Sequence, residues 1–227
     1  MVYLLNRRNA FREEGPPAGG RIIWYDADAA YVTKDGSNYV SQWDDKSGNG
    51  HHLTQSSGSY QPRWFSSQVN GYPSIYFNVD YLKTSSFTFN QPCTYYVVLN
   101  GQSGGYYDAL MNGLWGSTST LINRTATGNY NYYAGSNVVT NIPFSYQSYD
   151  IVMCCFNGSS SFLKENTGSK YNGNPGSANP SGFSLGMRVN SYQYVGYIAE
   201  VLGYNVAHND SQIAEVMGYL NEKYSIY

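Results

Sequence analysis

Short apolar runs alternate along the chain with clusters of Gly, Asn, Ser and Pro, a pattern typical of all-β domains. The strongest runs, residues 95–99 and 151–156, are long enough for strands covered on both faces. The predicted strands are 21–25, 39–43, 74–77, 94–99, 108–111, 120–123, 131–134, 150–156, 160–164, 183–187 and 194–204. Short strands without intervening helices predict a sandwich of two antiparallel sheets.

One segment, residues 210–224, has helical periodicity. Its apolar stripe consists of Ile213, Val216, Met217, Leu220 and Tyr224. Asn209 is a suitable N-cap, and Gln212 three residues later has the spacing of a capping box. Asp210 in the first turn and Lys223 in the last complement the helix dipole. We therefore predict one C-terminal helix that packs on the sheets.

Residues 1–21 differ from the rest of the chain. Four arginines stand against two glutamates, a net charge of +2, and Gly15-Pro-Pro-Ala-Gly-Gly20 has the composition of a linker. Such a segment is either a disordered tail or an arm that docks on a partner. The docking residues of an arm would be Tyr3, Leu4, Leu5, Arg7, Arg8 and Arg12. The predicted organisation is an arm over residues 1–21 and a sandwich, with its helix, over residues 22–227.

Composition narrows the function. The 227 residues carry a formal net charge of −2, and 12% are charged, which argues against a nucleic-acid partner. The 25 tyrosines, with many Ser, Gly and Asn, give an uncharged amphipathic surface suited to protein or sugar contacts. No apolar stretch approaches the ~20 residues of a membrane helix, so no membrane partner is expected. The N-terminal apolar run precedes its charges, the reverse of a signal peptide.

The three cysteines are Cys93, Cys154 and Cys155, an odd number that cannot form a closed disulfide framework. Cys154 and Cys155 are adjacent in a predicted strand, so their side chains point to opposite faces. We expect all three to be buried free thiols.

Four landmarks carry a resemblance to a known family. They are IWYDAD at 23–28, VSQWDDKSGNGHH at 40–52, QPR with NGYPSIYF at 61–63 and 70–77, and YIAEVLGY at 197–204. The chain resembles the laminin-G-like, concanavalin A-like modules common in bacteria and phages, whereas residues 100–190 have only general β character. The resemblance implies an all-β, two-sheet antiparallel jelly-roll sandwich with one C-terminal α-helix. It says little about function, because this fold carries lectins, glycosidases and structural modules.

The second landmark has two interpretations. Its oxygen-bearing side chains, which could ligate Ca²⁺, are Asp44, Asp45, Ser47 and Asn49. The alternative is a tight loop in which these side chains accept from backbone N–H groups while Gly48 and Gly50 adopt positive φ. We favour the loop and expect no cofactor. Trp24 and Trp43 are predicted to anchor the core or a sheet edge.

Catalytic motifs are missing from the sequence. Glycosidases of this fold use a Glu-x-Asp-x-x-Glu arrangement on one strand, and no glutamate here has such a partner. Glu200 is alone in its predicted strand and is interpreted as structural. No G-x-S-x-G, P-loop or H-E-x-x-H motif is present. We therefore expect a non-enzymatic protein.

Two functions fit. The first is a phage virion structural protein, such as a capsid decoration, head-fibre or tail-associated subunit. It would be made in the host cytoplasm and docked on other virion proteins at the virion surface through its arm. The alternative is a carbohydrate-binding module or adhesin that contacts cell-surface glycan through Tyr106, Tyr107, Trp115, Tyr130, Tyr132 and Tyr133. Core packing is the competing role of these aromatics, and homo-oligomerisation stays open.

Overall fold

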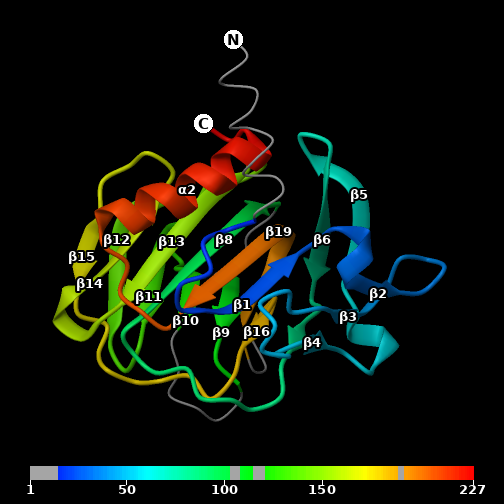
Figure 1. Ribbon diagram of the computed structural model, residues 1–227, viewed down its shortest axis with the longest axis horizontal. Coiled ribbons are helices and arrows are strands. Elements are labelled where there is room, and N and C mark those ends of the chain that lie inside the picture. Colours follow the sequence, from blue (N-terminus) through cyan, green and yellow to red (C-terminus); the bar gives the residue numbers. More distant parts are fainter. Residues whose placement is uncertain (1–14, 103–107, 115–120, 189–191) are drawn as a thin grey trace.

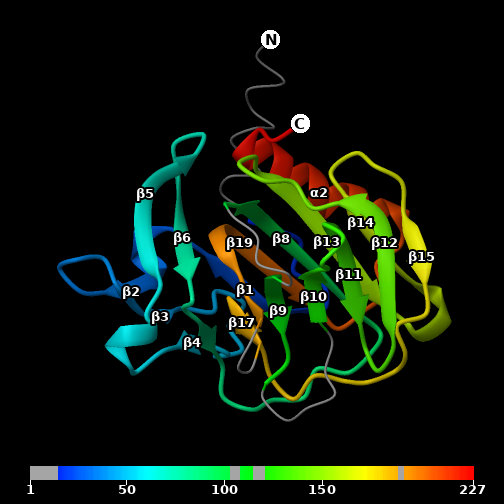
Figure 2. The same ribbon diagram turned by 180° about the vertical axis from the view of Figure 1, so that it is seen from behind.

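The computed structural model describes residues 15–102, 108–114, 121–188 and 192–227. Two large antiparallel sheets form a sandwich, and helix α2 (Asp210–Tyr224) lies across the outer face of one of them (Figures 1 and 2). This confirms the predicted all-β sandwich with its C-terminal helix, and the helix bounds agree with the prediction. No helix in the described ranges is long and apolar enough to span a membrane.

The sheet beneath the helix is called sheet A. Its strand order is β15-β14-β13-β8-β19-β6-β5, and β1 pairs with the C-terminal half of β19. The strands are β1 (Arg21–Asp26), β5 (Arg63–Val69), β6 (Tyr72–Asn78), β8 (Cys93–Gly101), β13 (Asp150–Phe156), β14 (Ser161–Glu165), β15 (Tyr171–Gly173) and β19 (Val195–Tyr204). Strand β19 thus has β8 on one side and is shared by β6 and β1 on the other.

The second sheet, sheet B, has the order β12-β11-β10-β9-β16-β7-β4-β3-β2. Its strands are β2 (Val32–Lys34), β3 (Val40–Trp43), β4 (Leu53–Thr54), β7 (Leu82–Lys83), β9 (Asp108–Asn112), β10 (Leu121–Arg124), β11 (Asn129–Tyr133), β12 (Asn137–Pro143) and β16 (Ser184–Leu185). A small ribbon pairs β17 (Met187–Arg188) with β18 (Tyr192–Gln193), and 3₁₀ turns cover η1 (Ala29–Tyr31), η2 (Gly58–Tyr60) and η3 (Gly158–Ser160).

Strands β8 and β13 are buried on both faces, as their continuous apolar sequences predict. Their alternate residues face the space between the sheets on one side and α2 on the other. Cys154 therefore lies in the inter-sheet core and Cys155 under the helix, and all three cysteines are free and buried. Burial raises the pKa of the Cys93 thiol to about 12, so this thiol stays protonated and inert.

The cap of α2 has the predicted form. The Asn209 side chain accepts from the Gln212 backbone N–H at 3.0 Å, and the Gln212 side chain accepts from the Asn209 N–H at 3.0 Å. The five residues of the predicted apolar stripe are all buried. The helix is therefore a packed cover over the middle of sheet A.

Several strands escaped prediction, chiefly β2, β4, β5, β7, β12 and β15. Most are two or three residues long or lie at an edge. The edge strand β12 has mostly exposed or half-buried residues, so it lacks the strong apolar alternation that identifies a strand.

The predicted linker lies on the sandwich over residues 15–20. The Tyr204 hydroxyl donates to the Pro17 carbonyl at 3.0 Å, and the Asn205 N–H donates to the Gly20 carbonyl at 2.9 Å. The Arg21 guanidinium also donates to the Pro16 carbonyl. The predicted docking residues Tyr3, Leu4, Leu5, Arg7, Arg8 and Arg12 lie outside the described residues.

Candidate functional site

The outer face of sheet A has two unlike halves, and the half under α2 is organised around Glu200. This side chain is fully buried. It accepts from Trp24 Nε1 at 2.8 Å, Tyr219 Oη at 3.0 Å, Lys223 Nζ at 2.7 Å and Tyr224 Oη at 2.8 Å. These donors belong to β1 and α2, so the carboxylate fastens the helix to the sheet. The structural interpretation of Glu200 agrees with this arrangement.

A second carboxylate extends this cluster. Asp26 Oδ2 lies 2.9 Å from Lys46 Nζ and 3.0 Å from Lys223 Nζ. Burial opposes ionisation of Asp26, but the two ammonium groups hold the pKa of its carboxyl below the usual value. Burial likewise disfavours a charged Lys223, yet Glu200 and Asp26 raise the pKa of its ammonium. All these charges are compensated within the chain, and the cluster leaves little room for a substrate.

The loop at residues 44–52 has the tight-turn structure that we favoured. Asp45 Oδ1 accepts from the Trp24 and Ser47 N–H groups at 3.0 and 2.9 Å, and Oδ2 accepts from the His51 N–H at 3.0 Å. Gly48 and Gly50 have φ of 91° and 76°. Asp45 is thus committed to three backbone N–H groups and to the Ser47 hydroxyl, which donates to Oδ2 at 2.8 Å. Among the described residues, no group of three or more His, Cys, Asp or Glu is placed to hold a metal.

The other half of the outer face carries a cluster of aromatic rings, called here the aromatic patch: Phe65, Tyr76 and Tyr197. Tyr76 on β6 and Tyr197 on β19 are direct cross-strand partners, and their ring centroids lie 4.8 Å apart. Phe65 on β5 lies edge-on to both, at 6.3 and 5.7 Å. All three side chains are partly exposed. Alternation explains their direction, because the neighbours Ile75 and Phe77 face the core.

Polar groups surround the aromatic patch. The exposed Arg63 guanidinium lies 5.5 Å from the Phe65 ring centroid. Asn100 on β8 is opposite Tyr197, and its Oδ1 accepts from Gln102 Nε2 at 2.6 Å. Hydroxyls, amides and a guanidinium therefore lie around the aromatic patch.

The electrostatics of the patch are mild. Partial burial, then the proximity of Tyr197 and Asp80, raises the pKa of the Tyr76 phenol, which stays neutral at physiological pH. Burial raises the pKa of the Asp80 carboxyl to about 6. The patch thus presents neutral rings with one titrating carboxylate nearby.

The structure does not bring the six predicted sugar-contacting residues together on one surface. Tyr130 and Tyr132 share one face of β11, as alternation predicts, but both rings are fully buried in the inter-sheet core. Their proposed stacking on sugar is therefore wrong, since a buried ring offers no free face. Tyr133 is half-buried, and Tyr106, Tyr107 and Trp115 lie outside the described residues.

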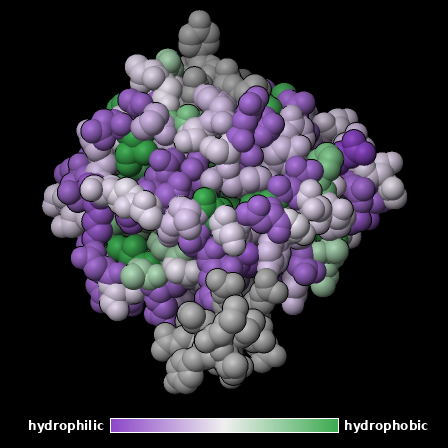
Figure 3. Space-filling view, turned by 90° about the horizontal axis from the view of Figure 1, so that it is seen from above, coloured by the Kyte–Doolittle hydropathy of each residue, from purple (hydrophilic) through white to green (hydrophobic). Residues whose placement is uncertain are grey.

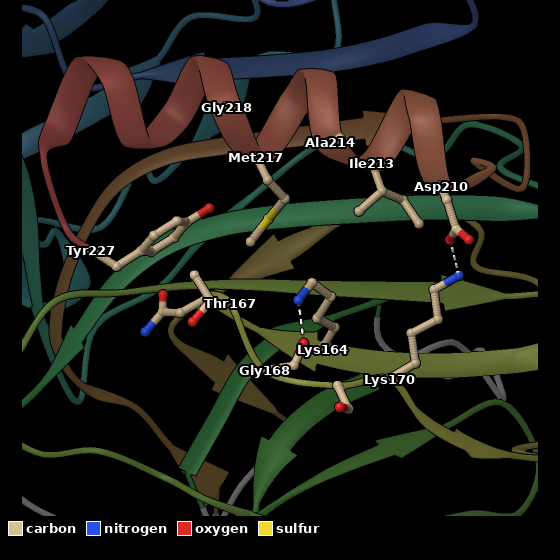
Figure 4. Close-up of a pocket in the computed structure, with 12 residues that line it drawn as sticks. Lys164, Thr167, Gly168, Lys170, Asp210, Ile213, Ala214, Met217, Gly218 and Tyr227 are labelled. Atoms are coloured by element: carbon tan, nitrogen blue, oxygen red, sulfur yellow. Dashed lines mark hydrogen bonds and ion pairs between the residues drawn. The ribbon is translucent and has the colours of Figure 1, made fainter.

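A groove of about 680 Å³ runs between α2 and the β14–β15 hairpin (Figure 4). Figure 4 shows Ile213 and Met217 pointing from the helix toward the hairpin. Lys164 Nζ donates to the Gly168 carbonyl, and Lys170 Nζ pairs with Asp210. Both ammonium groups are thus engaged within the chain. The helix side of the groove is mainly apolar, so it offers few hydrogen-bond partners to a polyhydroxylated ligand.

The face seen from above is mainly hydrophilic to neutral, with small separated hydrophobic areas (Figure 3). A surface of this kind is suited to contact with a polar ligand rather than to burial in a large apolar interface.

No protein-family model matches the chain, and no curated protein matches its sequence. Solved structures do share its fold. Domain 4 of a GH43 extracellular arabinanase from Geobacillus stearothermophilus, in complex with arabinotriose, aligns with a TM-score of 0.64 at 10% identity, over 87% of this chain and 98% of that domain.

Two further structures extend this likeness. Trypanosoma rangeli sialidase aligns with a TM-score of 0.59 at 10% identity over 95% of this chain, which spans 38% of the sialidase. A putative carbohydrate binding protein from Bacteroides ovatus aligns with a TM-score of 0.53 at 17% identity over 63% of this chain and 46% of its own. At these identities the likeness concerns the fold: this chain folds like β-sandwich domains of carbohydrate-related proteins.

Proposed function

We propose that the chain is a non-catalytic carbohydrate-binding module and that the aromatic patch is its sugar-contacting surface. The observation that carries this proposal is the mutual contact of three partly exposed rings on one face of sheet A. The C–H faces of sugar rings pack on aromatic rings, and their hydroxyls need nearby polar partners. The three rings of the patch provide the aromatic surface, and the groups around it provide the polar partners. We also propose membership of the laminin-G-like, concanavalin A-like modules.

The fold likeness supports this assignment over a virion role. The arabinanase domain was solved with arabinotriose, so arabinan is a natural first probe. Virion attachment would depend on the arm, most of which lies outside the described residues. A virion-surface location therefore remains a prediction, tested by deleting residues 2–20 and measuring co-sedimentation with the particle.

Binding without catalysis or metal is part of the proposal. Glu200 and Asp26 are held by buried donors, and Asp45 is held by backbone N–H groups. An acid–nucleophile pair needs free carboxylates on either side of the bond that is cleaved. Release of reducing sugar from arabinan or xylan by the purified chain would contradict this part.

Affinity gel electrophoresis with soluble arabinan, xylan, glucomannan and pectin tests the site. We expect retardation by at least one polymer, and about tenfold weaker binding in Tyr76→Ala and Tyr197→Ala, since truncating a central aromatic contact costs about 1–2 kcal/mol. Tyr60→Ala is the matched control. Tyr60 is 44% exposed, its ring centroid lies 5.8 Å from that of Tyr81, and it belongs to η2 rather than to β6 or β19. Equal losses in control and patch variants, or retardation by no polymer, would refute the site.

A further inference from the structure

The aromatic patch lies in a row of residues that runs straight across the strands of sheet A. Tyr76 on β6 has two direct partners, Arg63 on β5 and Tyr197 on β19, and Tyr197 is also paired with Asn100 on β8. Direct partners in antiparallel strands project to the same face of the sheet. The row from Arg63 to Asn100 therefore crosses the outer face over about 14 Å, given the usual spacing of about 4.8 Å between strands.

The cover on sheet A determines how a long ligand can lie on this row. Along β19, α2 covers Glu200, which lies three residues beyond Tyr197. The Tyr149 ring packs against the cluster beneath the helix, and its hydroxyl lies 3.3 Å from Ser74 Oγ, so it closes the same side of the patch. A chain aligned with the strands would meet this wall. A chain aligned with the row instead reaches the exposed Arg63 on the edge strand β5.

The rings of the patch are tilted relative to one another. The ring planes of Tyr76 and Tyr197 are at 45°, and Phe65 is edge-on to both, at 89° and 76°. A pyranose ring packs on one such face at a time, so successive sugars of a bound chain must be rotated as well. Since each pyranose ring lengthens an extended chain by a distance close to one strand spacing, the row fits about three rings of a twisted, soluble chain.

The Arg63 guanidinium gives the row its charge preference. It lies 5.5 Å from the Phe65 ring centroid, within the range of a cation–π contact, which holds it beside the patch. No carboxylate of the described residues lies within ion-pair distance of it, whereas Lys46, Lys170 and Lys223 are each paired with an acid. The planar fork of an arginine matches the two oxygen atoms of a carboxylate. The exposed end of the row is therefore suited to an anionic group of a ligand.

The acidic residues on neighbouring segments are directed to backbone donors. Asp35 Oδ1 accepts from the Tyr39 N–H at 2.8 Å. Asp80 Oδ2 accepts from the Asn78 N–H at 3.0 Å. Burial also raises the pKa of the Asp80 carboxyl to about 6, so its charge is lost below that pH. The Arg63 guanidinium remains charged throughout, and the charge next to the rings favours a carboxylate-bearing ligand.

We propose that the aromatic patch binds an acidic linear glycan, a chain of uronate sugars that lies across the strands with its rings over Tyr197 and Tyr76 and a carboxylate on the Arg63 guanidinium. This inference rests on the proposed function and names the class of polymer that the patch takes. Neutral polymers share the contacts with the rings but not the contact with Arg63, so they bind more weakly.

Isothermal titration calorimetry of the full chain with a trisaccharide of galacturonate tests this proposal, and the methyl ester of the same trisaccharide is the matched neutral ligand. We expect the acid to bind about tenfold more tightly than the ester, the gain expected for a hydrogen bond between charged groups. Arg63→Gln should remove this difference. Lys83→Gln, which removes an exposed charge from β7 in sheet B, is the matched control and should retain it. Added salt should weaken binding of the acid more than binding of the ester.

Equal affinity for acid and ester in the wild type would overturn the inference, as would a preference for the acid that survives in Arg63→Gln. The melting temperatures of the variants show whether each is folded. Tyr76→Ala and Tyr197→Ala decide the proposed function separately. If these rings retard a neutral polymer and the acid has no advantage over its ester, the proposed function stands and the inference fails. If no polymer is retarded and neither trisaccharide binds, both fail.

Discussion

The two halves of the outer face of sheet A use the same residue types for opposite purposes. Glu200 and Tyr197 lie three residues apart on β19, yet Glu200 is fully buried under α2 and Tyr197 is partly exposed. Under the helix, Tyr219 and Tyr224 donate their hydroxyls to Glu200 and are buried. Beyond it, the Tyr76 and Tyr197 rings contact each other and keep exposed area.

The difference between the halves arises because α2 covers one of them and not the other. Where α2 excludes water, every polar group must find a partner inside the protein, so the hydroxyls and carboxylates form a closed network. Where the sheet is open, a tyrosine hydroxyl can use water, and the ring remains available to a ligand. The same amino acid thus contributes stability in one half and a candidate contact surface in the other.

The largest expected effect on stability comes from disrupting the Glu200 network under α2. Glu200→Gln removes the charge that pairs with Lys223 and leaves the Trp24 and tyrosine donors poorly matched. We expect a loss of about 3–5 kcal/mol in the free energy of unfolding, measured by urea denaturation. Glu215→Gln, at an exposed position of α2, is the control and should change stability by less than about 0.5 kcal/mol. A loss below about 1 kcal/mol for Glu200→Gln would mean that the network is not closed.

Glu165 is intermediate between the two halves, since its side chain is half-buried and bonds to the buried Tyr130 hydroxyl. Its pKa is raised from 4.5 to about 7 in the folded chain, so the folded state holds its proton more tightly than the unfolded state. This group therefore favours folding at low pH, and its contribution falls as pH rises from about 4.5 to 7.

In Glu165→Gln, we expect the free energy of unfolding to fall less between pH 4.5 and 7 than in the wild type. The difference should be about 1–2 kcal/mol, which allows for solvent screening of a half-exposed group. Urea denaturation at a series of pH values measures it. His208, whose pKa burial lowers to about 4, contributes equally to both chains and cancels. Parallel pH curves would contradict the raised pKa of Glu165.

A smaller loss of stability is expected when the N-cap of α2 is removed, which tests whether the covered half and the aromatic patch are independent. Asn209→Ala removes the acceptor of the Gln212 N–H and should cost about 1 kcal/mol of stability. Asn209 lies at the N-terminus of α2 and is not part of the aromatic patch. Polysaccharide affinity should therefore stay unchanged. Reduced affinity with only the expected loss of stability would show that the cover and the aromatic patch are coupled.

The smallest expected effect separates the ring of Tyr197 from its hydroxyl. Tyr197→Phe keeps the stacking surface and should retain polysaccharide affinity within about threefold, whereas Tyr197→Ala should not. Affinity electrophoresis compares the two directly. A Phe variant as weak as the Ala variant would assign the contact to the hydroxyl rather than the ring.

The features that could be predicted from sequence are those whose residues lie close together in the chain. The capping box, the stripe of α2 and strand β13 have local patterns, and the structure has them at the predicted residues. The structural role of Glu200 could be inferred because no second acid stood near it in its strand, although its donors come from distant segments. Edge strands such as β12 gave too weak an apolar pattern.

The aromatic patch was missed for a different reason. Alternation within NGYPSIYF and YIAEVLGY turns Tyr76 and Tyr197 away from the core, but only the pairing of β6 with β19 brings their rings together. The tyrosine-rich sequence of β11 favours Tyr130 and Tyr132 as contact residues instead. Burial of that strand depends on sheet packing, which local sequence does not encode.

Mapping a bound polysaccharide on the full chain tests the central claim most directly. With the polymer selected by affinity electrophoresis, cut to short oligosaccharides, two-dimensional NMR should show the largest shifts at residues 63–65, 76 and 195–197, and these shifts should disappear in Tyr197→Ala but not in Tyr60→Ala. Shifts concentrated elsewhere on the chain, or unchanged in Tyr197→Ala, would contradict the assignment of the aromatic patch as the binding surface.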